Sequence, residues 1–213
     1  MAKIPDGVLG TLIGRVGPVT GYIRNGENIL RSAHSRSDRK VTAARIAQRD
    51  KIKVCNEFTK AFSGTGFFNK TFPAYGSSGT GYNRATSAIM NLAITQSATG
   101  IGINYSEVLI SKGVLPPAVA VIATATPESN ISFQWHDNSG NGTAKPNDKV
   151  ILVACFAEIR QAIFTIGTAT RMQCQSLLET KTLKGFTAET WVGFLSNDET
   201  NASNSSYCGS IEL

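Results

Sequence analysis

Residues 130–166 read NISFQWHDNSGNGTAKPNDKVILVACFAEIRQAIFTI, and this stretch decides the fold. Ile131, Phe133 and Trp135 alternate with polar residues, which is the period of a half-buried strand. A turn cluster, DNSGNG, separates them from the two apolar runs KVILVACF and QAIFTI. The pattern therefore predicts short antiparallel strands joined by turns.

The same two-residue period continues on both sides of this stretch. Strands are predicted over 119–126, 130–136, 149–156, 161–166, 171–178, 189–196 and 205–213. About seven short strands in fewer than a hundred residues are typical of an antiparallel β-sandwich. Pro116-Pro117 marks the predicted boundary between an N-terminal domain, 1–116, and the sandwich, 117–213.

Closely spaced glycines dominate residues 3–33 and oppose a regular helix there. Short strands or an extended arm joined by tight turns fit this segment, with Asn25-Gly26 at one turn. The segment has no GxxxxGK[ST] phosphate loop, so we expect the arm to pack against another backbone. The predicted docking residues of this assembly arm are Val8, Leu12, Val16 and Val19.

Two helices are predicted, over 42–62 and 82–98, with an aromatic loop over 63–81 between them and one strand over 101–110. In the first helix, offsets of 4 and 8 residues place basic side chains on one stripe. The fold class is thus α+β and mainly β: a Gly-rich arm with two helices, followed by the sandwich.

The basic excess lies in the first 60 residues, which hold 12 Lys and Arg against 5 acidic residues, a net charge of +7. The remaining residues hold 9 against 10. This asymmetry indicates either an acidic or polyanionic partner or a solvated helix face. The residues expected to meet a nucleic acid are Arg31, Arg36, Arg39, Lys40, Arg45, Arg49 and Lys53.

Motifs for catalysis or metal binding are missing from the sequence. It has no HExxH, CxxC or GxSxG, and DNSGNG lacks the acidic series of a calcium loop. We therefore expect no enzymatic activity, no metal and no cofactor, although an active site of scattered residues leaves no such motif. No signal peptide and no run of about 20 apolar residues is evident, which predicts cytoplasmic synthesis, reduced cysteines and no membrane partner.

Residues 119–213 resemble a fibronectin type III or immunoglobulin-like module. Trp135 stands at the position of a core tryptophan, and FTAETWVGFLSNDETNASNSS resembles the last two strands, with Trp191 near a corner aromatic. This resemblance implies a fold and not a function.

The whole chain resembles a bacterial family of unknown function, through KIPDGVLGTLIGRVGPVTG, YIRN and ILRS, TAARIAQRDKI, YSEVLISKGVLP and FQWHDNSGNGTAKPNDKVILV. The first 60 residues have a short Gly-rich opening, a basic segment and the pair Gln48-Arg49, and in this they also resemble small proteins encoded among prophage structural genes, which implies assembly rather than catalysis.

Two functions follow as hypotheses. The first is a non-enzymatic structural protein of a phage or phage-like particle, which assembles with copies of itself and with other particle proteins through the arm. The second is a nucleic-acid-binding protein that uses the basic N-terminal region without sequence preference.

Overall fold

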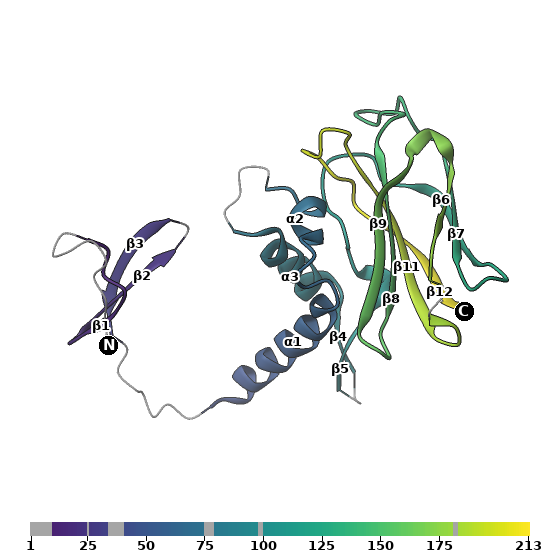
Figure 1. Ribbon diagram of the computed structural model, residues 1–213. Coiled ribbons are helices and arrows are strands. Elements are labelled where there is room, and N and C mark those ends of the chain that lie inside the picture. Colours follow the sequence, from purple (N-terminus) through teal and green to yellow (C-terminus); the bar gives the residue numbers. More distant parts are fainter. Residues whose placement is uncertain (1–9, 25, 34–40, 75–78, 98–99, 181–182) are drawn as a thin grey trace. The chain divides into compact units, whose positions relative to one another are not determined.

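The computed structural model describes residues 10–24, 26–33, 41–74, 79–97, 100–180 and 183–213. The chain divides into two compact units, Met1–Thr42 and Ala43–Leu213. Strands in antiparallel sheets predominate and three α-helices accompany them in the described residues, which confirms the α+β, mainly β class (Figure 1).

The first unit holds a three-stranded antiparallel sheet made of β1 (Gly14–Val16), β2 (Val19–Arg24) and β3 (Glu27–Ser32). Arg24 pairs with Glu27, so a two-residue turn closes the β2–β3 hairpin at the predicted place. Gly26 in this turn has a φ of +84°, a left-handed conformation that glycine adopts without steric cost. The Gly-rich segment is therefore a short meander of strands.

The second unit contains the predicted antiparallel β-sandwich. One sheet has the order β12-β11-β8-β9 and the other the order β10-β7-β6. The strands are β6 (Val119–Ala125), β7 (Ile131–His136), β8 (Lys149–Phe156), β9 (Gln161–Thr170), β10 (Gln175–Leu178), β11 (Thr187–Leu195) and β12 (Ser206–Glu212). Ile131, Phe133 and Trp135 point inward, as predicted, and pack with Leu152 and Phe194 of the facing sheet.

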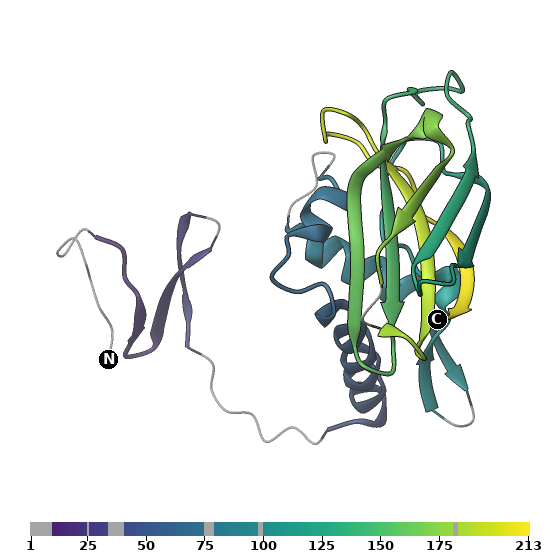
Figure 2. The same cartoon turned by 45° about the vertical axis from the view of Figure 1, so that its right-hand side comes forward.

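Three helices cover the outer face of the four-stranded sheet. They are α1 (Ala43–Lys60), α2 (Phe67–Thr71) and α3 (Gly81–Leu92). Aromatic contacts join the layers: the ring centroids of Phe58 and Trp191 lie 6.2 Å apart, and those of Phe67 and Phe164 lie 4.5 Å apart. Figure 2 shows the resulting three layers of helices, four-stranded sheet and three-stranded sheet.

This packing places the helices with the sandwich. Strand β8 alternates between two cores, with Ile151 and Val153 facing the helices and Val150 and Leu152 facing the three-stranded sheet. The boundary predicted between residues 116 and 117 falls inside the second unit, because the helical aromatics use the sandwich as their core.

Local differences from the expected elements have local causes. Of the predicted strand 101–110, only residues 101–103 form a strand, as part of β5 (Gly100–Ile103), and a 3-10 turn follows at Tyr105–Glu107. Strand β5 pairs in a hairpin with β4 (Ile94–Ser97), which lies within the predicted second helix. The second helix ends at Leu92 because the β-branched residues Ile94 and Thr95 pair in this hairpin. The aromatic loop contains α2, whose phenylalanines are buried anchors.

Candidate interaction surfaces

The three-stranded sheet of the first unit has two chemically different faces. Side chains alternate between faces along a strand, and paired residues point to the same side. The pairs Val16–Val19 and Gly21–Leu30 therefore share one face, together with Ile23. We call Val16, Val19, Ile23 and Leu30 the apolar face.

The apolar face is open to solvent. The exposed fractions of Val16, Ile23 and Leu30 are 52%, 54% and 59%. Leu12 lies across the centre of this face, since a Cβ at Gly21 would lie 2.3 Å from the Leu12 carbonyl oxygen. Among the described residues of the first unit, most apolar side chains of this face are therefore without a cover.

The structure brings together three of the four predicted arm residues on this face: Leu12, Val16 and Val19. Val8 lies outside the described residues. Sequence reasoning missed Ile23 and Leu30. The signal that could have found them is the predicted turn at Asn25-Gly26, because the position of a hairpin turn sets the strand register and so places these two residues on the same face.

The opposite face of the sheet is basic. It carries Arg15, Thr20, Tyr22, Arg24, Glu27, Ile29 and Arg31. The guanidinium carbon of Arg31 lies 5.5 Å from the centroid of the Tyr22 ring, a cation–π contact. Arg31 therefore belongs to a different unit from the basic residues of α1, and Arg36, Arg39 and Lys40 lie outside the described residues.

The basic residues of α1 border a groove of about 800 Å³. Its cationic side chains are Arg49, Lys53, Lys60 and Arg160, and its other lining residues are Ile52, Asn56, Glu57 and Ser63. We call this the basic groove. Arg45 is exposed one turn earlier on α1 and does not line it. Arg160 comes from the turn after β8 and lies beside α1 through a tertiary contact. The sequence alone therefore could not indicate that Arg160 belongs to this groove.

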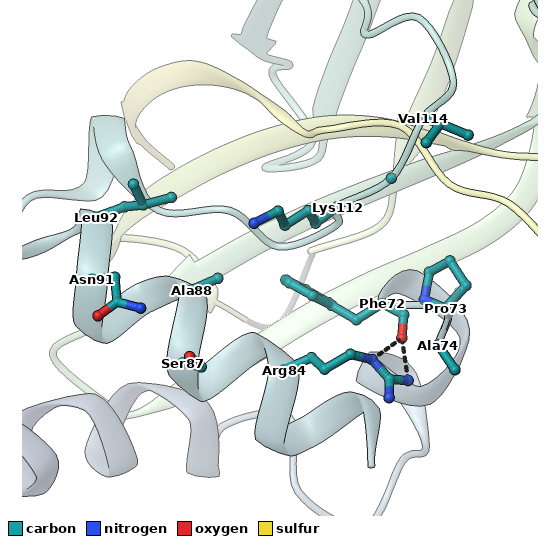
Figure 3. Close-up of a pocket in the computed structure, with 11 residues that line it drawn as sticks. Phe72, Pro73, Ala74, Arg84, Ser87, Ala88, Asn91, Leu92, Lys112 and Val114 are labelled. Atoms are coloured by element: carbon teal, nitrogen blue, oxygen red, sulfur yellow. Dashed lines mark hydrogen bonds between the residues drawn. The ribbon is translucent and has the colours of Figure 1, made fainter. Parts of the chain in front are cut away.

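A second hollow, of about 520 Å³, lies between α3, the segment after α2 and residues 112–114 (Figure 3). Arg84 donates from Nε and Nη2 to the Phe72 carbonyl oxygen, at 3.0 and 2.6 Å, and from Nη1 to the Gly79 carbonyl oxygen at 2.8 Å. All three guanidinium nitrogens of Arg84 therefore donate to backbone carbonyl groups of the segment between α2 and α3. Leu92 and Val114 are 50% and 67% exposed, so we call this hollow the apolar groove.

Three thiols of the second unit, those of Cys55, Cys155 and Cys208, are poorly suited to nucleophilic chemistry. Burial raises the pKa of Cys55 to about 11 and that of both Cys155 and Cys208 to about 12. Thiols with such pKa values are protonated at neutral pH, whereas the thiolate is the nucleophile and the metal ligand.

Two further kinds of site are missing from the described residues. These residues contain no group of three or more His, Cys, Asp or Glu side chains that could hold a metal ion. Within the same residues, no helix has both the length and the apolar character needed to cross a membrane.

The model of a family of unknown function (DUF6266) matches residues 11–209, which span the three-stranded sheet, the helices and nearly all of the sandwich. No curated protein matches the chain.

Proposed function

The chain belongs to this family of unknown function, and from that premise we propose that it is a non-enzymatic structural protein that self-assembles through its N-terminal three-stranded sheet. The apolar face carries the proposal. A short three-stranded sheet needs a packed hydrophobic face for stability, and exposed apolar surface marks sites of protein interaction. Covering each of Val16, Ile23 and Leu30 would contribute about 1 kcal/mol, since each is already half-buried.

A second copy of the chain is the proposed partner. The sheet and the body, Ala43–Leu213, are separate compact units, so one copy can offer its sheet while its body receives the sheet of another. Such a head-to-tail contact is heterologous and therefore closes into a ring or continues as a filament. The apolar groove, with Leu92 and Val114 on its rim, is the proposed acceptor on the body.

A phage or phage-like particle is the proposed setting. The similarity of the first 60 residues to prophage structural proteins supports it, and other particle proteins would then be further partners. Electron microscopy of the purified protein tests this setting, because a particle component should form rings, tubes or shells of regular dimensions.

Neighbouring residues of β3 provide a matched test of the apolar face. Leu30→Asp places a carboxylate on the apolar face, and we expect it to convert the assembly to monomers because the buried charge would be unpaired. Arg31→Asp changes more charge on the opposite face and should leave assembly in place. Sedimentation velocity over a range of protein concentrations measures both. A wild-type protein that stays monomeric, or equal assembly of Leu30→Asp and wild type, would refute the proposal.

The acceptor has its own variant, Val114→Asp. We expect it to reduce assembly as Leu30→Asp does. In a mixture of the two variants, the intact sheet of Val114→Asp can bind the intact groove of Leu30→Asp, and assembly should stop at this single contact. Dimers in that mixture, seen by sedimentation, would show that the two surfaces meet each other. If Val114→Asp assembles normally, the sheet docks elsewhere on the body.

A further inference from the structure

The basic groove between α1 and the β8–β9 turn carries an inference independent of assembly. Among the described residues that line it, four cationic side chains face one carboxylate, Glu57, which leaves a net charge of +3. In the part of the chain that the structure describes, none of the four forms an ion pair. Unpaired like charges around one hollow repel each other unless an anion joins them, so the groove is complementary to a polyanion.

Arg160 adds a second observation. Its backbone has a φ of +54°, in the left-handed region where glycine or asparagine is favoured and a long side chain is uncommon. Its N–H donates to the Ala157 carbonyl oxygen at 3.3 Å, which forms the turn. An arginine at a position that suits glycine indicates that its side chain serves something besides the turn.

The lining distinguishes a nucleic acid from an acidic protein. Protein interfaces are centred on buried aromatic anchors and are depleted of lysine, whereas the described lining of this groove has Ile52 as its apolar residue and includes Lys53 and Lys60. Asn56 and Ser63 add polar groups that can bond phosphate oxygens. None of the described residues lining the groove is aromatic, so the groove has no platform among them for stacking unpaired bases.

The spacing of the cations suits a phosphate backbone. Along the axis of α1, Arg49 and Lys53 are about 6 Å apart and Lys60 is about 10.5 Å further on, at 1.5 Å per residue. Arg160 faces them from the turn after β8, so the cations line two sides of the groove. We propose that the basic groove binds the sugar–phosphate backbone of duplex nucleic acid, without base readout.

The test uses the full-length protein and a fluorescein-labelled duplex DNA of 24 base pairs, with anisotropy measured across a salt series. Four phosphate contacts predict a slope of log K against log salt of up to about −3.6. Arg160→Glu should weaken binding at least about 8-fold at 0.1 M salt and reduce the magnitude of the slope by about 1. Lys184→Glu is the control, because it makes the same reversal of charge at an exposed site outside the groove.

Arg160→Gly separates binding from folding. Glycine relieves the left-handed backbone and removes the cation, so the variant should melt at a higher temperature yet bind DNA more weakly. Arg49→Glu with Lys53→Glu should abolish binding at 0.1 M salt. The proposal is overturned if Arg160→Glu matches Lys184→Glu, if Arg24→Glu with Arg31→Glu abolishes binding while the groove variants do not, or if polyglutamate competes as well as unlabelled DNA.

Discussion

Arg171 connects several parts of the sandwich through the hydrogen bonds and the ion pair of one buried side chain. Its side chain is fully buried and its Nε donates to Asp148 Oδ2 at 3.1 Å. Nη1 donates to Asn138 Oδ1 at 2.5 Å and Nη2 to the Pro116 carbonyl oxygen at 3.2 Å, while the guanidinium carbon lies 3.8 Å from the Phe194 ring centroid. Burial lowers the pKa of Arg171, and the neighbouring Asp148 carboxylate opposes that shift.

Removing the negative charge from this pair should be costly. Asp148→Asn leaves a buried guanidinium without its counter-ion, and we expect the free energy of unfolding to fall by about 3 kcal/mol. Urea unfolding followed by tryptophan fluorescence measures this, because Trp135 donates from Nε1 to the Arg171 carbonyl oxygen and reports on the site. Glu128→Gln, at an exposed turn, should leave the urea midpoint unchanged. Equal midpoints for both variants would contradict the assignment.

At the scale of elements, the three-stranded sheet depends on a close approach at Gly21. The Leu12 carbonyl oxygen would lie 2.3 Å from a Cβ at that position, so Gly21→Ala must displace the segment that crosses the apolar face. We expect faster amide hydrogen exchange over 14–32 and loss of self-assembly. Gly102→Ala is the matched control, because a Cβ there has no neighbour within 4 Å. Unchanged exchange in Gly21→Ala would show that the crossing does not stabilise the sheet.

Glu199 joins helix α2 to the sandwich. Its carboxylate lies 2.7 Å from Lys149 Nζ and 3.0 Å from Lys70 Nζ. Hydrogen bonds from Lys149 and then Lys70 lower the pKa of Glu199. A lowered folded-state pKa gives stability that is present above the unfolded pKa, near 4.3, and is lost as the pH falls through the folded value.

Glu199→Gln tests this pH dependence. We expect the variant to be less stable than wild type at pH 7 by no more than about 1 kcal/mol, since the ion pairs are partly exposed, and we expect this deficit to be smaller at pH 3. Thermal unfolding at both pH values measures the difference. Glu128→Gln should follow wild type at each pH, and a Glu199→Gln deficit that is as large at pH 3 as at pH 7 would point to packing instead of charge.

The elements that could be predicted from the sequence are those with a strong local period. Strand β7 alternates Ile131, Phe133 and Trp135 with polar residues, and its predicted bounds agree within one residue. Strand β8 was also predicted, but its seven consecutive buried residues, 150–156, carry a further signal. A continuous apolar run is typical of a strand covered on both faces, and it points to a third layer.

The parts of the candidate surfaces that could not be predicted depend on register or tertiary contact. Val16 and Val19 are predicted docking residues of the Gly-rich segment, whereas Ile23 and Leu30 join them on one face through strand pairing. Arg160 lies 100 residues beyond Lys60 in the chain and faces α1 only after folding. A single sequence holds no local pattern for such a convergence.

At the scale of the whole molecule, the second unit should fold only with its helices. In a fragment of residues 117–213, the helix-facing residues Ile151, Val153 and Trp191, which are all fully buried, would lose their cover. A newly exposed apolar sheet face promotes aggregation and the binding of hydrophobic dyes. The fragment 43–213 keeps all three layers and should unfold in one cooperative transition.

Tryptophan emission and dye binding compare the two fragments directly. Trp191 contacts Phe58 of α1 with ring centroids 6.2 Å apart, so its emission should shift to longer wavelength in 117–213 and stay native-like in 43–213. Phe58→Ala in 43–213 gives an intermediate case, because deleting a buried aromatic ring costs about 3–5 kcal/mol and leaves a cavity between the helix and sheet layers. If 117–213 is instead soluble, binds no dye and unfolds at the same urea concentration as 43–213, the sandwich is self-sufficient. The helices would then be an attached layer, and the boundary near residue 117 would mark a true domain.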